Sequence, residues 1–466
     1  MLKNKKIKNV AVRFAEIIEL FSYFNIVPAL FPLLVFGIQD LNFSMYFIIQ
    51  GFAMLIFARL IKQFFGPIEE DIPFSHNLIA IVLAWIMIPF FCAYVYFQTG
   101  LGVLDSYFES VSAWTTTGFS IYPNLSELPK QVIFWRSFEQ WLGGLGIVAF
   151  VFFLFEQKTN PFLFTKTEGR IDFIKPTMKG TLKTILKIYF LLTFIGLSLL
   201  SFSGMDFYNA LNISMTAIPT GGFIPTQQLE TTHLQNMIII LLVVFGATPF
   251  FIHYNLYRGR FSPIFKYTPL HLMVLFIVLV SFLGISSNID PMDAIFHSAS
   301  AMTNAGFSIS KLDSSLGSYF YALIVLMLIG GCLGSTAGAV KIDRVFIVIK
   351  GIKLKIEKML SPPDAIVIER FMNHSIKDEH IANASLIILI HLAVFLSAAL
   401  ILNFYADDLS SSLFEVASAM GNVGLSDGIV GAGLPGAYKS LFIFLMIAGR
   451  IEFLTFLVFI ASIFKR

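Results

Sequence analysis

One short motif occurs four times along the chain, and it constrains the fold more than any other feature of the sequence. In each copy a threonine or asparagine stands two residues before a glycine, and an aromatic residue or leucine follows that glycine. The four copies are Trp114–Ser120, Ile218–Ile224, Met302–Ser308 and Met420–Ser426. Such repetition indicates repeated structural units, so we expect four related units built around these glycines.

A short segment suited to a helix precedes each motif. Each segment opens with a residue that caps helix N-termini well, and the predicted N-caps are Asp105, Asp206, Asp293 and Ser412. About ten residues of helix span roughly 15 Å, which is half a bilayer. A half-length helix followed by irregular backbone is typical of a re-entrant pore loop, because irregular backbone at membrane depth must be buried in protein or line a watery path.

Four such loops around one axis would present rings of backbone carbonyl oxygens that replace the hydration shell of a cation, as in potassium channels. Glycine suits this role because it adopts backbone angles that a side chain disfavours. The alternative is that the glycines are small residues at contacts between membrane helices. Four copies, each after a half-helix, favour the pore loops.

Composition assigns the protein class independently of the motif. Apolar residues make up 56% of the chain and charged residues 13%, and the mean hydropathy is +0.79. A soluble domain carries about 25% charged residues, so this is a polytopic membrane protein. The two cysteines, Cys92 and Cys332, lie in apolar runs and indicate neither a disulfide framework nor a metal site. The spans contain no paired aspartates, nucleophile dyad or zinc motif, so we expect neither an enzyme nor a bound cofactor.

Apolar stretches of about 20 residues predict ten membrane spans in an all-α protein. They lie near residues 16–37, 43–65, 75–98, 131–155, 184–204, 234–257, 268–286, 318–346, 380–404 and 437–463. The last eight form four helix–pore loop–helix pseudo-repeats around one pore, and the first two are an N-terminal addition. We expect the extension in residues 1–70 and the pore repeats in residues 71–160, 161–260, 261–360 and 361–466.

Lysine and arginine gather on one side of these spans, which predicts the orientation. The N-terminus and the connections 156–183 and 347–379 are basic, so both termini are expected in the cytoplasm and the four loops should enter from outside. Basic segments beside a membrane are topology determinants or contacts with lipid headgroups. The alternative is a docking surface for a regulatory protein.

Two further stretches accompany the loops in the same order as in a known superfamily. They are Trp135–Gly146, which reads Trp-Arg-Ser-Phe-Glu-Gln-Trp-Leu-Gly-Gly-Leu-Gly, and Gly330–Lys341, which contains Gly-Ser-Thr-Ala-Gly. With the four loops, they resemble the Trk/Ktr/HKT superfamily of potassium transporters over nearly the whole chain. The N-terminal pair of spans places the resemblance closest to the bacterial Trk-type membrane subunit.

The resemblance implies a potassium-uptake permease in the bacterial inner (plasma) membrane, with potassium as substrate rather than cofactor. It also implies a homodimer in the lipid bilayer and a cytosolic nucleotide-binding regulatory subunit of the TrkA type, with no nucleic-acid partner. In the family, serine at the first loop's glycine accompanies sodium transport, and this chain has Gly118. The alternative is a sodium-selective permease or a sodium- or proton-coupled potassium symporter of the same superfamily.

Alignment of the loops with the channel signature Thr-Val-Gly-Tyr-Gly identifies the expected selectivity filter. Two asparagines stand in the threonine place, which would change the side-chain oxygens that reach the ion. The residues predicted to bind potassium are Thr116, Thr117, Gly118 and Phe119; Thr220, Gly221, Gly222 and Phe223; Asn304, Ala305, Gly306 and Phe307; and Asn422, Val423, Gly424 and Leu425.

The stretch Gly330–Lys341 is expected to break its span, because glycine disfavours helix by about 1 kcal/mol per position. It is not a phosphate-binding loop, which needs Gly-Lys-Ser/Thr in sequence. The resemblance implies an intramembrane loop that obstructs the pore, opposed by an arginine on the last inner helix. The predicted gate residues are Gly330, Gly331, Gly334, Ser335, Thr336, Gly338, Lys341 and Arg450. For Arg450 the alternative is a pair with Glu452, although residues two apart do not share a helix face.

Acidic residues accompany the predicted outer ends of the loops, where they would attract cations or cap the short helices. We expect capping to be their main role. They are Asp105, Glu109, Asp206, Asp290, Asp293, Asp407, Asp408, Glu415 and Asp427. His297 lies in the third short segment and shows no metal-ligand spacing, so a packing role is expected.

Overall fold

A computed structural model describes residues 2–37, 41–67, 73–156, 178–362, 369–371 and 374–464. Helices account for the regular structure of these residues, apart from the antiparallel pair β1 (Arg370–Phe371) and β2 (His374–Ser375). The all-α prediction is confirmed. Most of the predicted basic connection 156–183 lies outside the described residues.

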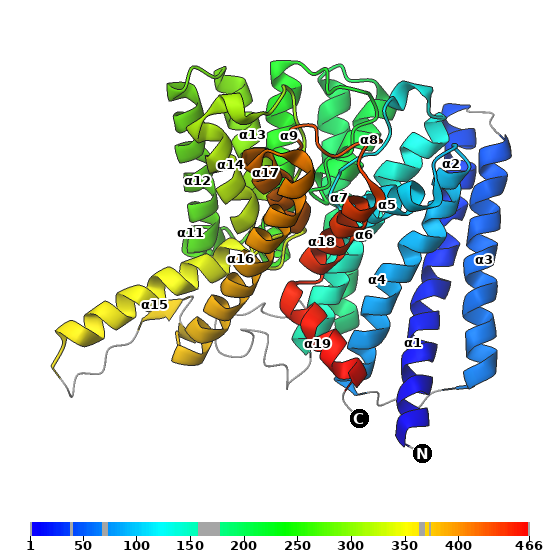
Figure 1. Ribbon diagram of the computed structural model, residues 1–466, viewed down its shortest axis with the longest axis horizontal. Helices are drawn as coiled ribbons and strands as arrows, with labels where there is room; N and C mark the ends of the chain where they lie inside the picture. The colour runs from blue at the N-terminus through cyan, green and yellow to red at the C-terminus, as the bar shows by residue number, and fades with distance from the viewer. Residues whose placement is uncertain are drawn as a thin grey trace.

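Three helices precede the first loop-bearing unit. They are α1 (Leu2–Phe24), α2 (Ile26–Phe36) and α3 (Leu41–Phe65). They pack at one edge of the bundle, beside α4 (Figure 1). The ring of Phe21 on α1 meets that of Trp114 at a centroid distance of 4.8 Å, and Trp85 packs on Trp114 at 5.6 Å. The N-terminal helices therefore support the helix that leads into the first loop.

The rest of the chain repeats one pattern four times: a long helix, a short helix, an irregular loop and a second long helix. The first unit contains α4 (Phe74–Phe97), α5 (Val103–Trp114), η1 (Leu125–Glu127) and α6 (Lys130–Glu156). The second contains α7 (Met178–Phe202), α8 (Phe207–Ala217), α9 (His233–Gly246) and α10 (Phe250–Tyr257). After α11 (Ser262–Lys266), the third contains α12 (Thr268–Ser286), α13 (Pro291–Thr303), η2 (Ser314–Leu316), α14 (Ser318–Ile329) and α15 (Ile342–Leu360). The fourth contains α16 (Asp378–Ala406), α17 (Leu409–Gly421), α18 (Gly436–Arg450) and α19 (Phe453–Phe464).

Six helices within the described residues are long and apolar enough to cross a membrane, and two bent pairs of helices qualify when each pair is taken together. The chain is thus a multi-pass membrane protein. The first predicted span starts too late, since helix extends back to Leu2 with a turn at Asn25. The exact domain boundaries remain predictions, and those at residues 70 and 160 lie outside the described residues.

Two predicted spans are not continuous. α9 and α10 meet at 104°, and α18 and α19 meet at 98°. Pro249 begins the turn into α10, where its ring and missing N–H prevent the helix from continuing. Glu452 lies in the left-handed region, with φ of 66°, between α18 and α19. The second long helix of each unit is called its inner helix below. These breaks and the one after α14 show that three of the four inner helices are interrupted, and only α6 is continuous.

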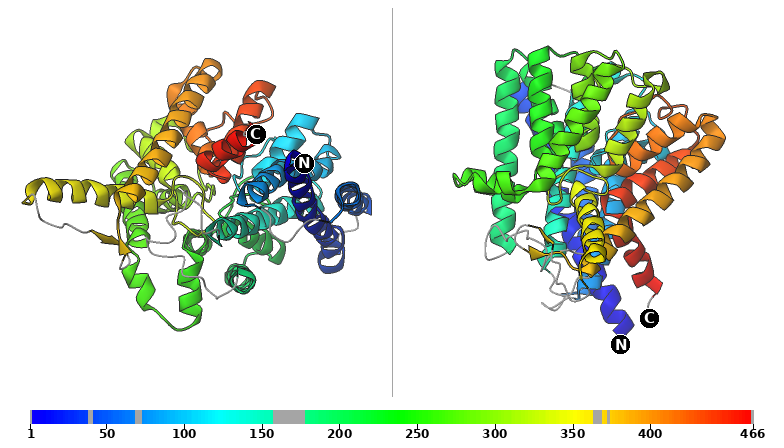
Figure 2. Two further views of the ribbon diagram at one scale, coloured as in Figure 1. Left: turned by 90° about the horizontal axis from the view of Figure 1, so that it is seen from below. Right: turned by 90° about the vertical axis from the view of Figure 1, so that its left-hand side faces the viewer.

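The two ends of the chain lie on the same side of the bundle, and the four short helices lie in the opposite half (Figure 1). α15 projects sideways from the bundle on the side of the termini, as Figure 2 also shows. The four loops therefore enter from the side opposite the termini, as predicted, while the assignment of the side of the termini to the cytoplasm stays a prediction.

Candidate functional site

The four loops adopt one backbone conformation. The threonine or asparagine after each short helix is left-handed, with φ of 54° at Thr116, 56° at Thr220, 58° at Asn304 and 53° at Asn422. The next residue in each loop donates its N–H to a carbonyl five residues earlier, at 2.8–2.9 Å. The glycine that follows has φ between 73° and 95°. Four copies of the motif thus produce four copies of one turn.

The loops close into a ring in chain order. A Cβ added at each motif glycine would overlap the carbonyl oxygen of the residue before the glycine in the next loop. These overlaps run from Gly118 to Gly221, from Gly222 to Ala305, from Gly306 to Val423, and from Gly424 back to Thr117. Only a closed arrangement of four loops produces this cycle, and only glycine fits at each step.

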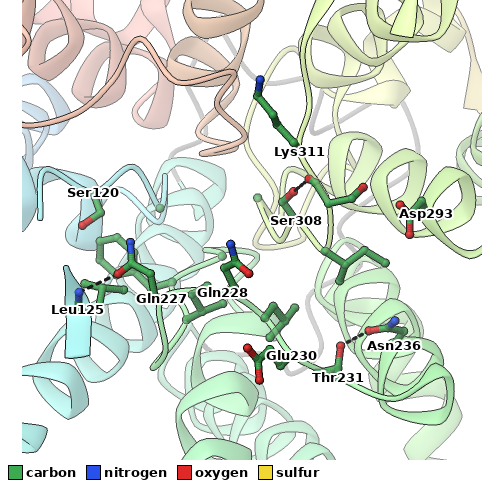
Figure 3. Close-up of a pocket in the computed structure, with 18 of the residues that line it drawn as sticks. Ser120, Leu125, Gln227, Gln228, Glu230, Thr231, Asn236, Asp293, Ser308 and Lys311 are labelled. Carbon is green, nitrogen blue, oxygen red and sulfur yellow. Dashed lines mark hydrogen bonds between the residues drawn. The ribbon is translucent and has the colours of Figure 1, made fainter. Parts of the chain in front are cut away.

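The ring opens on one side into a cavity of about 1000 Å³ (Figure 3). Gly118, Gly222 and Gly306 form its floor, together with residues that follow them in their loops. Its walls include the acidic residues Glu230, Asp290 and Asp293 and one lysine, Lys311. The ring therefore has a wide polar mouth on the side opposite the termini.

The stretch Gly330–Lys341 lies at the other end of the ring. It contacts residues that precede the glycines of three loops. Thr336 Oγ1 donates to the carbonyl of Ile218 at 2.8 Å, and the Gly331 N–H donates to Asn304 Oδ1 at 3.4 Å. A Cβ at Gly338 would overlap the carbonyl oxygen of Gly421. This irregular stretch, which we call the crossing loop, therefore passes across loops 2, 3 and 4.

Side chains on two inner helices hold the crossing loop. Arg450, the last residue of α18, is 3% exposed and donates from Nη1 to the carbonyl oxygen of Thr336 at 2.8 Å. Asp343 accepts from the Leu333 N–H at 2.6 Å and from the hydroxyl of Tyr267. The Lys341 ammonium donates to the carbonyl of Ala337. Buried positive charge and backbone carbonyls thus meet at the inner end of the ring.

Comparison with known proteins agrees with this geometry. Residues 44–268 and 273–465 match the family model of TrkH, described as a cation transport protein. The chain belongs to the TrkH family. Membership agrees with the expectation of a transport protein rather than an enzyme, and it confirms the resemblance given by the loop motifs.

Relatives in the TrkH family match along nearly the whole chain. An uncharacterized cation transporter of Methanocaldococcus jannaschii is 30% identical, over 99% of this chain and 97% of its own length. The Trk system potassium uptake protein TrkI of Halomonas elongata is 25% identical over the full length of both chains. The crystal structure of the potassium transporter TrkH from Vibrio parahaemolyticus superposes with a TM-score of 0.85 at 22% identity, covering 99% of this chain and 100% of that one. That likeness shows a shared fold.

The predicted caps of the short helices are correct at one helix and wrong at three. Asp206 caps α8, accepting from the backbone N–H groups of Tyr208 and Asn209 at 3.1 and 3.2 Å. The caps of α13 and α17 are Asp290 and Asp408, each three or four residues before the predicted Asp293 and Ser412. The N-cap of α5 is Gly102, and the predicted cap Asp105 lies in its first turn. Asp290 and Asp408 are nevertheless among the acids expected to cap the short helices, and that expectation is confirmed for both. At α13 the sequence left two choices, because an acidic residue at either Asp290 or Asp293 complements the positive helix end.

Two acids expected at the outer mouth are instead buried behind the loops. Glu109 and Glu415 are both 0% exposed. Glu109 Oε2 accepts from the N–H of Ile121 at 2.9 Å, and Glu415 Oε1 accepts from that of Asp427 at 3.2 Å. Neither can concentrate cations at the mouth, and neither caps a helix. The spacing in the sequence could have indicated this shared position behind the loops, because Glu109 and Glu415 each stand nine residues before a motif glycine.

The two asparagines of the ring do not present their amide nitrogens to a central ion path. Asn304 Nδ2 donates to the carbonyl of Met327 on α14 at 3.0 Å, and Asn422 Nδ2 donates to that of Met446 on α18 at 2.8 Å. Each amide thus anchors its loop to the inner helix that follows. The remaining residues of the predicted filter all lie in the ring or directly beside it, and all of them are buried except Gly118, Gly306 and Gly424, which are half-buried.

The alternative partner for Arg450 is wrong. Glu452 pairs with Arg344, its two oxygens lying 2.8 and 2.9 Å from Nη2.

A glycine recurs on each inner helix at the point where that helix passes the short helix of its unit. A Cβ at Gly143, Gly246 or Gly449 would overlap the carbonyl oxygen of Trp114, Ile218 or Met420, respectively. Gly330 stands at the corresponding place in the third unit. Gly143 and Gly330 lie in the two stretches that carry the family resemblance, whereas Gly246 and Gly449 lie outside them.

Proposed function

We propose that this chain is a potassium-uptake permease in which ions pass through the ring of four loops. The observation that carries the proposal is the cyclic approach of each glycine to the next loop's carbonyl. Carbonyl oxygens arranged around one axis can replace the water molecules around a dehydrated cation. The short helices also end at the ring, so the negative ends of their dipoles favour a cation there.

Potassium is the proposed substrate because all four loops keep the glycine, including Gly118, and because relatives carry the name of Trk system potassium uptake proteins. Potassium would contact the backbone of the sixteen predicted filter residues, chiefly the carbonyls of Thr117, Gly221, Ala305 and Val423. No further metal or cofactor is required for this role. Sodium selectivity and coupling to sodium ions or protons are the competing outcomes of the experiment below.

The crossing loop and Arg450 are proposed to form the gate. The loop passes across three of the four loops at the inner end of the ring, where a permeating ion must leave. A fixed positive charge in such a poorly hydrated place repels a cation more strongly than it would in water. Movement of the crossing loop would then open the path without changing the ring.

The proposed setting is the inner (plasma) membrane, with both termini in the cytoplasm and the chain paired as a homodimer. A cytosolic nucleotide-binding subunit of the TrkA type is the proposed regulator. Its docking surface would lie on the side of the termini, where α15 carries Lys350, Lys353, Lys355 and Lys358. Phe371 of the adjacent strand pair contacts Tyr267, whose hydroxyl holds Asp343, so this surface connects to the crossing loop.

Ion fluxes in proteoliposomes test the proposal. Purified protein would be reconstituted, and uptake of potassium, rubidium and sodium would be measured with an imposed voltage and with no voltage. Voltage-driven potassium uptake that exceeds sodium uptake supports the permease. Sodium uptake that equals or exceeds potassium uptake contradicts potassium selectivity. Potassium uptake that requires a sodium or proton gradient indicates a symporter, and no cation uptake overturns the proposal.

A further inference from the structure

Three of the four loops are held from behind in the same way. The residue nine positions before the glycine is polar, and it accepts a hydrogen bond from the backbone N–H three positions after that glycine. The bonds are Ile121 to Glu109 at 2.9 Å, Ile309 to His297 at 3.2 Å and Asp427 to Glu415 at 3.2 Å. His297, expected to serve only packing, thus fills the place of a glutamate. Each bond fixes the part of a loop that follows its glycine to the short helix of the same unit.

Loop 2 cannot form this bond. The residue nine positions before Gly222 is Ile213, which has no polar atom in its side chain. The residue three positions after Gly222 is Pro225, which has no backbone N–H to donate. Loop 2 therefore lacks both the side-chain acceptor and the backbone donor of this hydrogen bond, so other contacts must fix its position in the ring.

Two side chains of α6, which belongs to the first unit, supply these contacts. Gln140 Nε2 donates to the Gly221 carbonyl at 2.7 Å, and its Oε1 accepts from the Phe223 N–H at 3.2 Å. The Arg136 guanidinium lies over the Phe223 ring, 3.9 Å from the ring centroid, and Nη1 donates to the Ile224 carbonyl at 3.5 Å. Gln140 and Arg136 are four residues apart, so they share one face of the helix.

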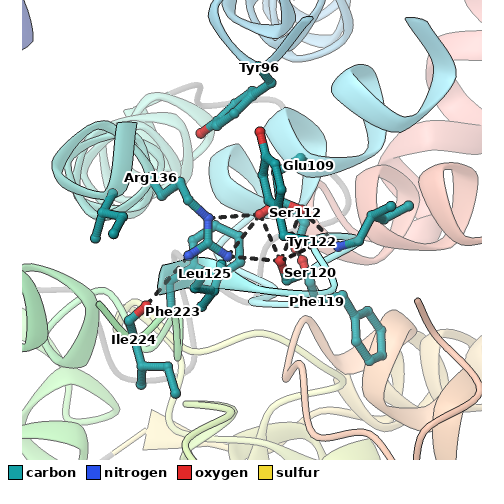
Figure 4. Close-up of polar contacts among 12 residues, drawn as sticks. Tyr96, Glu109, Ser112, Phe119, Ser120, Tyr122, Leu125, Arg136, Phe223 and Ile224 are labelled. Atoms are coloured by element: carbon teal, nitrogen blue, oxygen red, sulfur yellow. Dashed lines mark hydrogen bonds and ion pairs between the residues drawn. The ribbon is translucent and has the colours of Figure 1, made fainter. Parts of the chain in front are cut away.

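Arg136 holds loop 1 at the same time (Figure 4). Its Nε donates to Glu109 Oε1 at 2.8 Å, and its Nη2 donates to the Ser120 hydroxyl at 3.0 Å. The side chain of Arg136 is 1% exposed and that of Glu109 is 0% exposed. One guanidinium thus joins the acid that holds loop 1 to two residues of loop 2.

We propose that Arg136 is a specificity-determining positioning residue that sets the separation of loops 1 and 2 in the ring. The inference rests on the proposed function, because it concerns the spacing of carbonyls that would contact the ion. A guanidinium has a rigid, planar set of donors that can serve both loops at once. A lysine keeps the charge and can pair with Glu109, but it cannot reproduce the two-sided contact. Loss of the second contact leaves loop 2 held by Gln140 alone.

Relative fluxes of potassium, rubidium and sodium in proteoliposomes test this inference, with the variants Arg136→Lys, Arg136→Gln and Gln140→Met. Each should still transport potassium, while the potassium-to-sodium ratio should fall by about tenfold, the scale of one hydrogen bond to a charged group. Lys439→Gln is the matched control. It removes another ion pair of α5, the half-buried pair of Lys439 and Asp105 at 2.6 Å, which contacts none of the loop glycines, and its flux ratio should equal that of the parent.

The outcomes separate the inference from the proposed function. Parent-like flux ratios in Arg136→Lys and Gln140→Met, with potassium still transported, overturn the inference and leave the permease intact. A parent that transports no potassium overturns both. If Arg136→Gln fails to fold because Glu109 is left unpaired, Arg136→Lys and Gln140→Met decide the matter. If the potassium-to-sodium flux ratio falls equally in Lys439→Gln, the effect comes from a general loss of packing, and this result also overturns the inference.

Discussion

Arg450 and Thr336 lie 114 positions apart in the sequence and are joined by a hydrogen bond of 2.8 Å, from the guanidinium Nη1 to a main-chain carbonyl oxygen. Through this bond the last residue of α18 holds the middle of the crossing loop. The Arg450 Nε and Nη2 atoms are buried without a hydrogen-bond partner among the described residues. The arginine is therefore only partly satisfied in this arrangement, as the proposed gate would require of a contact that is released on opening.

Replacement of Arg450 by alanine is expected to raise potassium flux without changing selectivity, because it removes both the bond to Thr336 and the fixed charge. Arg450→Lys should fall between alanine and the parent, and Arg450→Gln separates the two effects by keeping a donor without the charge. Uptake into proteoliposomes at matched protein content measures this. If Arg450→Ala folds normally yet transports no faster than the parent, Arg450 has a structural role and the gate lies elsewhere, first at Lys341 and Arg344.

The Tyr267 hydroxyl is expected to help keep the crossing loop closed. It donates to Asp343, whose other oxygen accepts from the Leu333 N–H of that loop at 2.6 Å. Tyr267→Phe should lower the free energy of unfolding by about 1–3 kcal/mol, since a buried acceptor loses its donor. It should also raise basal flux. Tyr319→Phe is the control: its hydroxyl donates to the Ala294 carbonyl at 2.9 Å, away from the crossing loop, so it should affect stability alone. Equal basal flux in the two variants would refute this role of Tyr267.

Serine at any of the four motif glycines should lower discrimination of potassium from sodium. The new Cβ would overlap a carbonyl oxygen of the next loop, and the positive φ disfavours a side chain. The family pattern predicts the largest effect for Gly118→Ser. Gly317→Ser controls for backbone strain alone, because Gly317 has φ of 59° but open space around it. Unaltered cation preference in all four variants, at normal expression, would exclude the ring as the filter.

Cysteine labelling tests the orientation of the chain. Exposed Ser126 and Ser314 lie on the side of the ring's mouth, and exposed Ser375 lies in β2, on the side of the termini. Ser126→Cys and Ser314→Cys should react with an impermeant thiol reagent applied outside cells, and Ser375→Cys should not. The native Cys92 and Cys332 are buried, so the background is expected to be low. Labelling of Ser375→Cys in intact cells would show that the chain has the opposite orientation in the membrane. Thr167, in the basic connection 156–183, lies outside the described residues.

Local sequence signals predicted the repeated architecture well. A half-helix, a polar residue and a glycine specify one turn wherever they occur, so four copies of the motif predicted four copies of the structure. The sequence did not reveal which of two nearby acids caps α13, since Asp290 and Asp293 both suit a first turn. Pro249 is a local signal for the bend before α10, but the hydrophobic residues on both sides of it favour one continuous span.

Contacts between distant parts of the chain escaped prediction for a different reason. The pairing of Arg344 with Glu452 joins residues 108 positions apart, one on α15 and one at the bend between α18 and α19, so no local sequence pattern points to it. Glu109 and Glu415 were expected at the outer mouth because acids in membrane proteins suggest exposure to ions. A comparison of the four repeats places them correctly. In the three loops with Glu109, His297 or Glu415 nine positions before the glycine, the residue two positions after the glycine is serine. In the loop with Ile213 in that place, the residue two positions after the glycine is isoleucine.

The contacts of Gln140 with Gly221 and Phe223 also bear on how such chains can be recombined. Although the four units look like interchangeable modules, the second quarter of the ring depends on a helix encoded in the first. A chimera that receives only the second unit from a relative would set a foreign loop against the native α6. The smallest segment that can be exchanged as a working piece therefore runs from α4 through loop 2, whereas the third and fourth loops carry their own anchoring residues with them.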